Sequence, residues 1–75
     1  MGKPITHKQI LAKFGQKMQK VRQSKDITQE GLAAMLGMHR TYIGLIERGE
    51  RNPTVRTLYK ISKALKVTAS DLLPF

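Results

Sequence analysis

Arginines surround one short segment of this sequence, at a spacing that suits contact with an anionic polymer. Arg40, Arg48 and Arg51 flank an apolar stripe at helical spacing, which follows a glycine turn. A guanidinium group presents its N–H donors in a planar fork that matches either a phosphate or the O6 and N7 atoms of guanine. A hydrophobic core needs the apolar stripe but does not need the arginines, so the arginines are candidates for binding.

The residues that would support catalysis or metal binding are not arranged for either. The chain contains no cysteine, and its two histidines, His7 and His39, are far apart in the sequence. No paired acids stand at ligand spacing, so a metal site is not expected. The segment 44–49 resembles the start of a phosphate-binding loop, but Glu50 and Arg51 stand where lysine and a hydroxyl residue are needed. We therefore expect no enzyme, no cofactor and no small-molecule ligand.

The composition favours a small basic domain. The 75 residues include 14 Lys and Arg, which give a formal net charge of +9. Half of these basic residues lie in the first 25 positions, where there is no acid. Such a charge attracts DNA, but it would also suit an anionic membrane surface, and this second class of partner stays open. No apolar run approaches the roughly 18 residues of a membrane span, so a cytoplasmic protein outside the membrane is expected.

Hydrophobic periodicity predicts five helices and no strand. Apolar residues at helical spacing indicate a first helix over about 6–25, after a short tail at 1–5. Thr28 caps a second helix that Gly37 ends, and a third is expected over about 39–48. Thr54 caps a fourth that ends near Lys66, and a short fifth lies between Thr68 and Pro74. The expected fold is an all-α, compact five-helix domain that occupies residues 1–75.

The second and third predicted helices are joined by a very short turn. Only Gly37 and Met38 separate them, so the helices must cross steeply, as in a helix-turn-helix over about 28–48. The sequence resembles the Cro and repressor type of helix-turn-helix regulator, which implies a lambda-repressor-like, XRE-like fold. The resemblance covers about 14–73 and rests on Thr28-Gln29-Glu30, Leu32-Ala33, Gly37, Tyr42-Ile43, Ile46-Glu47, Gly49 and Arg51-Asn52-Pro53, followed by Leu58, Ala64-Leu65 and Asp71-Leu72-Leu73.

A narrower resemblance lies within that family. The run 39–43, together with Arg51-Asn52, is similar to the small controller proteins of restriction–modification systems. Stand-alone phage, plasmid and chromosomal regulators share the same run. The resemblance implies a transcriptional regulator that binds double-stranded DNA, and a DNA-binding antitoxin is the alternative within this class. Double-stranded RNA is a poor partner, because its deep, narrow groove excludes a helix.

The amino end of the third helix is the expected reader of DNA bases. A helix in the major groove contacts base edges chiefly with residues near its amino end. Arg40 is the leading candidate, with guanine as its target. At 100° per residue, Ile43, Ile46 and Glu47 face inward and the opposite side faces outward. The predicted base-contact residues are His39, Arg40, Thr41, Gly44 and Leu45.

Residues around this helix are expected to hold the DNA backbone. The resemblance implies that Gln29, at the amino end of the second helix, touches a phosphate and braces Arg40. Arg56 opposes the dipole of the fourth helix, and a phosphate partner explains it better than helix stability does. Tyr42 could donate its hydroxyl group to a phosphate or pack beside the turn. The predicted backbone-contact residues are Gln29, Tyr42, Arg51, Asn52, Thr54 and Arg56.

A buried ion pair and a dimer surface complete the expectations. Glu47 faces inward and needs a cationic partner, and the resemblance places that partner at Arg22. One reader helix is too small for useful specificity, so we expect a homodimer on a pseudo-palindromic operator. The apolar residues near the carboxyl end are divided between the core and the dimer interface, and the interface candidates are Leu72, Leu73 and Phe75. An activator would also need a surface for RNA polymerase, with Arg48 and Glu50 as candidates.

Overall fold

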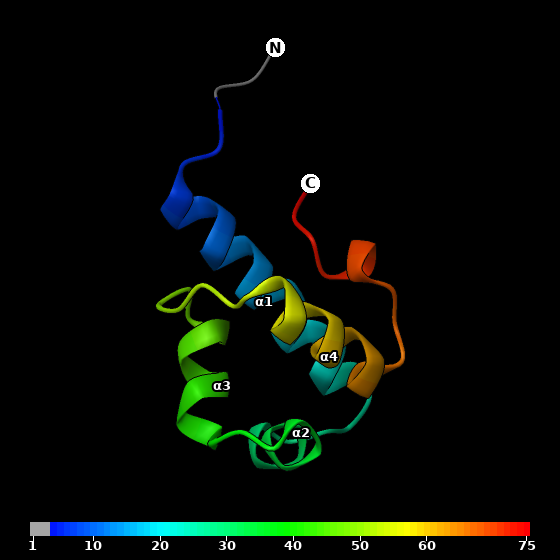
Figure 1. Ribbon diagram of the computed structural model, residues 1–75. Coiled ribbons are helices and arrows are strands. Elements are labelled where there is room, and N and C mark those ends of the chain that lie inside the picture. Colours follow the sequence, from blue (N-terminus) through cyan, green and yellow to red (C-terminus); the bar gives the residue numbers. More distant parts are fainter. Residues whose placement is uncertain (1–3) are drawn as a thin grey trace.

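The computed structural model describes residues 4–75, so residues 1–3 of the expected tail lie outside the described part. It contains four α-helices and one short 3-10 helix, η1, with no strand in the described residues (Figure 1). The prediction of a fifth helix after Thr68 is therefore wrong, because the residues there form a single 3-10 turn. The elements are α1 (His7–Ser24), α2 (Gln29–Leu36), α3 (Arg40–Glu47), α4 (Val55–Leu65) and η1 (Ala69–Asp71).

Side-chain caps explain why the four helices begin where they do. The hydroxyl oxygen of Thr28 accepts a hydrogen bond from Gly31 N at 2.9 Å, and that of Thr54 accepts one from Thr57 N at 3.1 Å. Each bond satisfies a backbone N–H that has no partner within its own helix. Thr6 caps α1 in the same way and exchanges a second hydrogen bond with Gln9. The helix boundaries predicted from the sequence agree with these caps to within about two residues.

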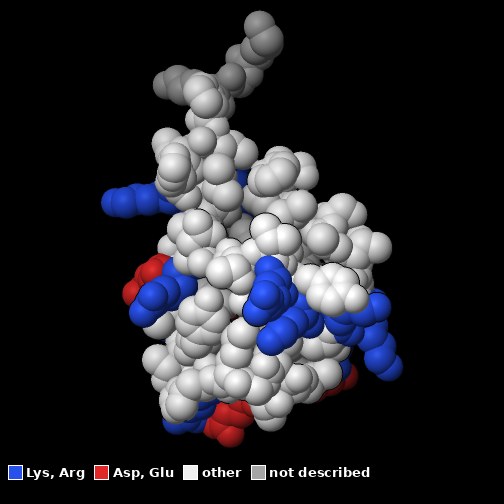
Figure 2. Space-filling view, in the orientation of Figure 1, with Lys and Arg blue, Asp and Glu red and all other residues white. Residues whose placement is uncertain are grey.

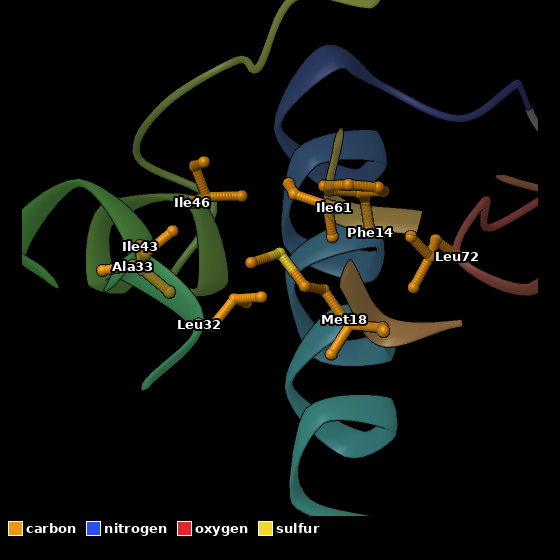
Figure 3. Packing of buried hydrophobic residues seen from close by; sticks show 9 residues of the cluster. Phe14, Met18, Leu32, Ala33, Ile43, Ile46, Ile61 and Leu72 are labelled. Carbon is orange, nitrogen blue, oxygen red and sulfur yellow. The ribbon is translucent and has the colours of Figure 1, made fainter. Parts of the chain in front are cut away.

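The core lies where α1 crosses α4 and meets the α2–α3 pair. Met18 extends from α1 toward Leu32 and Ile46, whereas Leu72 lies on the opposite side of α1, beside Phe14 (Figure 3). The nine buried apolar side chains are Phe14, Met18, Leu32, Ala33, Ile43, Ile46, Ile61, Leu65 and Leu72. Every α-helix contributes at least one of them, so the position of α3 is set by contacts with the rest of the molecule. None of the helices within residues 4–75 is both long and apolar enough to cross a membrane.

A close crossing of α1 and α3 requires glycine at two places. A Cβ atom on Gly15 would lie 2.4 Å from the carbonyl oxygen of Glu47, which is far inside contact distance. Gly49 ends α3 with φ at +77°, and a Cβ atom there would lie 2.9 Å from the Cα atom of Ala12. The glycine in the middle of α1, which lowers helix propensity, is therefore explained by this crossing.

The carboxyl end of the chain turns back onto the core. Leu72 is fully buried, so it cannot belong to a dimer interface, and this part of the prediction is wrong. The η1 turn carries Leu72 inward and is held by the backbone N–H and hydroxyl groups of Thr68, which both donate to the Asp71 carboxylate. These hydrogen bonds, the backbone one first, lower the pKa of Asp71 below its usual value.

Candidate nucleic-acid interface

A left-handed glycine sets the angle between α2 and α3. Gly37 has φ at +68°, and the next residue, Met38, donates its backbone N–H to Ala33 O at 2.9 Å. This arrangement terminates a helix and reverses the chain within two residues. Ala33 is buried, and its small side chain lies among those of the core. The short turn and the steep crossing predicted from the sequence are present, with α3 at one side of the molecule (Figure 1).

The amino end of α3 is exposed, and the side chain of His39 caps it. His39 Nδ1 accepts a hydrogen bond from Thr41 N at 3.1 Å, so the imidazole ring is committed to the helix start. The side chains of Arg40 and Thr41 lie on the surface beside it. The expected orientation of these two residues, outward from the turn, is what the structure shows. His39 remains exposed, although its cap occupies one ring nitrogen.

The middle of α3 differs from the expectation. Ile43, Ile46 and Glu47 are buried as predicted, but Gly44, which was expected on the outward side, is also buried. The side chains of Gln29 and Arg48 cover it, since a Cβ atom on Gly44 would lie 3.2 Å from Arg48 Nη1 and 3.8 Å from Gln29 Oε1. Leu45 is half-buried and is not fully turned outward. Base contact through Gly44 is therefore not supported by its position.

A groove lies between the amino end of α2 and the outer side of α3. Its volume is about 590 Å³, and most of its lining residues are polar or charged. Three of the predicted base-contact residues, Arg40, Thr41 and Gly44, line it, and Gln29 from the predicted backbone set lines it as well. The complete lining is Arg22, Thr28, Gln29, Glu30, Arg40, Thr41, Gly44 and Arg48. The folded chain thus brings together residues that are up to 26 positions apart.

Two exposed ion pairs lie at the edge of this groove. Arg40 Nη1 is paired with the carboxylate of Glu30, and Arg48 Nε lies 2.5 Å from Glu50 Oε2. Figure 2 shows basic and acidic atoms in contact at the lower edge of the molecule, below the position of α2 in Figure 1. The Glu30–Arg40 pair could not be predicted from the sequence, because these residues belong to different helices.

Beneath the groove, the predicted Arg22–Glu47 ion pair is present and buried. Arg22 Nε and Nη2 lie 2.6 and 3.0 Å from the two carboxylate oxygens of Glu47, and Arg22 Nη1 donates to Ile27 O at 2.7 Å. The amide nitrogen of Gln29 donates to the same carboxylate at 2.9 Å. Gln29 was expected to brace Arg40, but its hydrogen bond goes to Glu47. This network joins α1, α2 and α3 beneath the groove.

The predicted backbone-contact residues are mostly on the surface. Arg51, Asn52, Thr54 and Arg56 are exposed at the start of α4. Within residues 4–75, neither Arg51 nor Arg56 has an acidic partner, so both guanidinium groups are available to an external anion. Tyr42 is half-buried and packs against the core, which favours the second of its two predicted roles. The Thr54 hydroxyl group is committed to the cap of α4.

An apolar surface lies along α4 and the chain end, and its α4 part, Val55 and Tyr59, was not among the predicted interface residues. Val55, the first residue of α4, is 83% exposed, and Tyr59, one turn later, is 61% exposed. Phe75 is 79% exposed, while Leu73 packs partly against the core. Of the three predicted interface residues, only Phe75 lies fully on the surface. A helical count from the buried residues Ile61 and Leu65 would have placed Val55 and Tyr59 on the outer side.

Comparison with known proteins supplies the family context. A family model described as helix-turn-helix matches residues 18–72. The control protein C.BamHI of Bacillus amyloliquefaciens is 52% identical over 63 residues, which cover 83% of this chain and 78% of that protein.

Two solved structures of restriction–modification controller proteins have the same fold. C.AhdI from Aeromonas hydrophila superposes with a TM-score of 0.81 at 38% identity, over 84% of this chain and 96% of that one. C.Esp1396I, solved as a tetramer in complex with its natural 35 base-pair operator, gives a TM-score of 0.71 at 43% identity, over 77% of this chain and 76% of that one. The similarity therefore covers most of each chain.

Proposed function

The chain belongs to the helix-turn-helix family, and from this membership we propose that it is a sequence-specific regulator of transcription that binds double-stranded DNA. The observation that carries the proposal is the exposed amino end of α3, where Arg40 and Thr41 line a polar groove beside the amino end of α2. Side chains in this position reach the base edges when the helix enters the major groove. Its similarity to controller proteins favours control of a restriction–modification system.

The polar and charged residues around the groove have two proposed roles. Arg40 and Thr41 read bases, because they stand at the first turn of α3. Arg51 and Arg56 hold phosphates, because they are exposed, unpaired within residues 4–75 and located beside the start of α4. Asn52 adds a polar side chain to the phosphate-binding set. Phosphate contacts fix the register of a protein on DNA, whereas base contacts select the sequence.

The proposed active form is a homodimer. Two reader helices about 34 Å apart would lie in successive major grooves and read the two halves of a pseudo-palindrome. We place the dimer surface on Val55, Tyr59 and Phe75, which are exposed, with support from Leu73. Val55, Leu73 and Phe75 also line one largely apolar cavity of about 140 Å³, so the surface is continuous with the end of the chain. Each copy of residues 1–75 would act as one DNA-binding domain.

Selection of duplexes from a random pool tests this function directly. The expected result is a pseudo-palindromic sequence whose half-sites are centred one helical turn apart. Retention of all duplexes to the same extent would contradict sequence-specific binding. Binding to vesicles that contain anionic lipid, without binding to duplex DNA, would favour the membrane-surface alternative. Exposed lysines of α1 at 8, 13, 17 and 20 supply positive charge for long-range attraction in either case.

A further inference from the structure

Glu30 is an acidic residue on the surface that we expect to face DNA. It lies in the first turn of α2 and lines the same groove as Arg40, where we expect the polyanionic DNA backbone to approach. The chain has only five acidic residues, so the placement of one at this surface is notable in view of its net charge of +9. A carboxylate at this surface repels phosphates and weakens binding to any duplex.

The contribution of Glu30 to folding does not explain this placement. Its carboxylate is paired with Arg40, but the two side chains are 67% and 64% exposed, respectively. Ion pairs that are exposed to this degree add little to stability, because water screens the charges and both side chains lose rotamer freedom. Glu30 does favour the dipole of α2, but any acid in the first turn would do so without reaching across to α3.

The neighbouring residue cannot position Arg40. Gln29 donates its side-chain amide to Glu47 at 2.9 Å, which turns it toward the buried ion pair. Glu30 is the residue of α2 whose side chain contacts the Arg40 guanidinium group. The bond uses Nη1, so N–H donors on Nε and Nη2 remain for a base. A guanine needs two such donors at O6 and N7.

We propose that Glu30 is a positioning residue that determines base specificity through Arg40, an inference that rests on the proposed DNA-binding function. Its carboxylate holds the Arg40 guanidinium group at the start of α3, so less rotamer freedom is lost when a guanine is bound. The same negative charge weakens complexes in which Arg40 would contact only phosphates. Both effects increase the ratio of operator affinity to non-specific affinity, one by favouring the correct complex and the other by disfavouring the wrong ones.

The chain provides a matched control in the second exposed pair. Glu30→Gln and Glu50→Gln remove the same charge, and each breaks an exposed ion pair with an arginine that lines the groove. We would select duplexes from one random pool with the wild type, both variants, Arg40→Ala and the double variant Glu30→Gln/Arg40→Ala. Affinities for the selected duplex and for a scrambled duplex, together with melting temperatures, complete the measurements.

The expected results separate positioning from charge. Both glutamine variants should bind the scrambled duplex more tightly than the wild type, because one repulsive charge is lost. Only Glu30→Gln should weaken the preference for guanine at the base that Arg40→Ala identifies, by about threefold to tenfold. In the Arg40→Ala background the Glu30 substitution should not change base preference further, because the residue that it positions is gone.

Three outcomes would overturn the inference. The first is that Glu30→Gln keeps its guanine preference and gains as much affinity for the scrambled duplex as Glu50→Gln does. This result would show that Glu30 acts through charge alone. The second is that Glu30→Gln and Glu50→Gln lose the guanine preference to the same extent. The third is a wild-type protein that selects no motif, and this result would remove the proposed function itself, so the two failures are distinguishable.

Discussion

Replacement of Glu47 with Gln tests the buried ion pair that supports α3. The side chain of Arg22 is 8% exposed and that of Glu47 is 2% exposed, so water screens neither charge effectively. The Glu47 carboxylate accepts three hydrogen bonds, two from Arg22 and one from Gln29. A glutamine amide has one oxygen to accept them, and its NH₂ group would face an N–H donor of Arg22 or Gln29.

The expected cost follows from these contacts. Loss of one partner of a buried pair leaves an uncompensated charge and destabilises a protein by about 3–5 kcal/mol. At 0.05–0.15 kcal/mol per residue, a chain of this length has a total stability of about 4–11 kcal/mol. Since 1 kcal/mol shifts the melting temperature of a domain of this size by about 4–8 °C, Glu47→Gln should melt more than about 12 °C below the wild type.

Circular dichroism at 222 nm during thermal and urea unfolding is the appropriate assay. Glu50→Gln is the matched control, because it breaks an exposed pair and should cost less than about 1 kcal/mol. The double variant Arg22→Met/Glu47→Leu removes both charges and should melt above Glu47→Gln. If Glu47→Gln melts within 2 °C of the wild type, the reasoning about the buried charge is refuted.

Three further predictions concern binding, packing and assembly. Arg40→Ala should relax base preference and cost about 1–3 kcal/mol of binding free energy per half-site. Arg51→Ala should weaken binding to all duplexes similarly and reduce the slope of log affinity against log salt concentration by up to about 0.9. Equal effects of both variants in a salt titration would contradict the division of roles. Gly15→Ala should destabilise the fold by about 1–3 kcal/mol in urea unfolding, because its Cβ atom would lie 2.4 Å from a backbone oxygen of α3. Gly44→Ala is its control, because the atom nearest to the added Cβ there is the end of a flexible arginine side chain. Equal losses of stability in the two variants would be evidence against the close crossing of α1 and α3. Val55→Glu should reduce dimer content in sedimentation equilibrium while changing monomer stability by less than about 0.5 kcal/mol, because Val55 is 83% exposed; an unchanged dimer would place the interface elsewhere.

The helices and their ends could be predicted from the sequence because they depend on nearby residues. Thr28 and Thr54 each cap a backbone N–H three positions away, and Gly37 adopts a left-handed conformation that few other residues tolerate. The outward direction of Arg40 and Thr41 follows from the helical period and from the inward stripe of Ile43 and Ile46. The fifth helix was wrong because its few residues form a 3-10 turn that carries Leu72 into the core.

The sequence by itself therefore determined four helices, the Thr28 and Thr54 caps, the short turn and the side of α3 that faces out. Only the tertiary structure decided that Glu30 meets Arg40, that Gln29 bonds to Glu47 and that Gly44 is covered. It also decided that Leu72 is buried while Val55 and Phe75 stay on the surface. The physical reason is range: a cap or a helical period involves residues a few positions apart, whereas contacts between helices depend on the angles at which the helices cross.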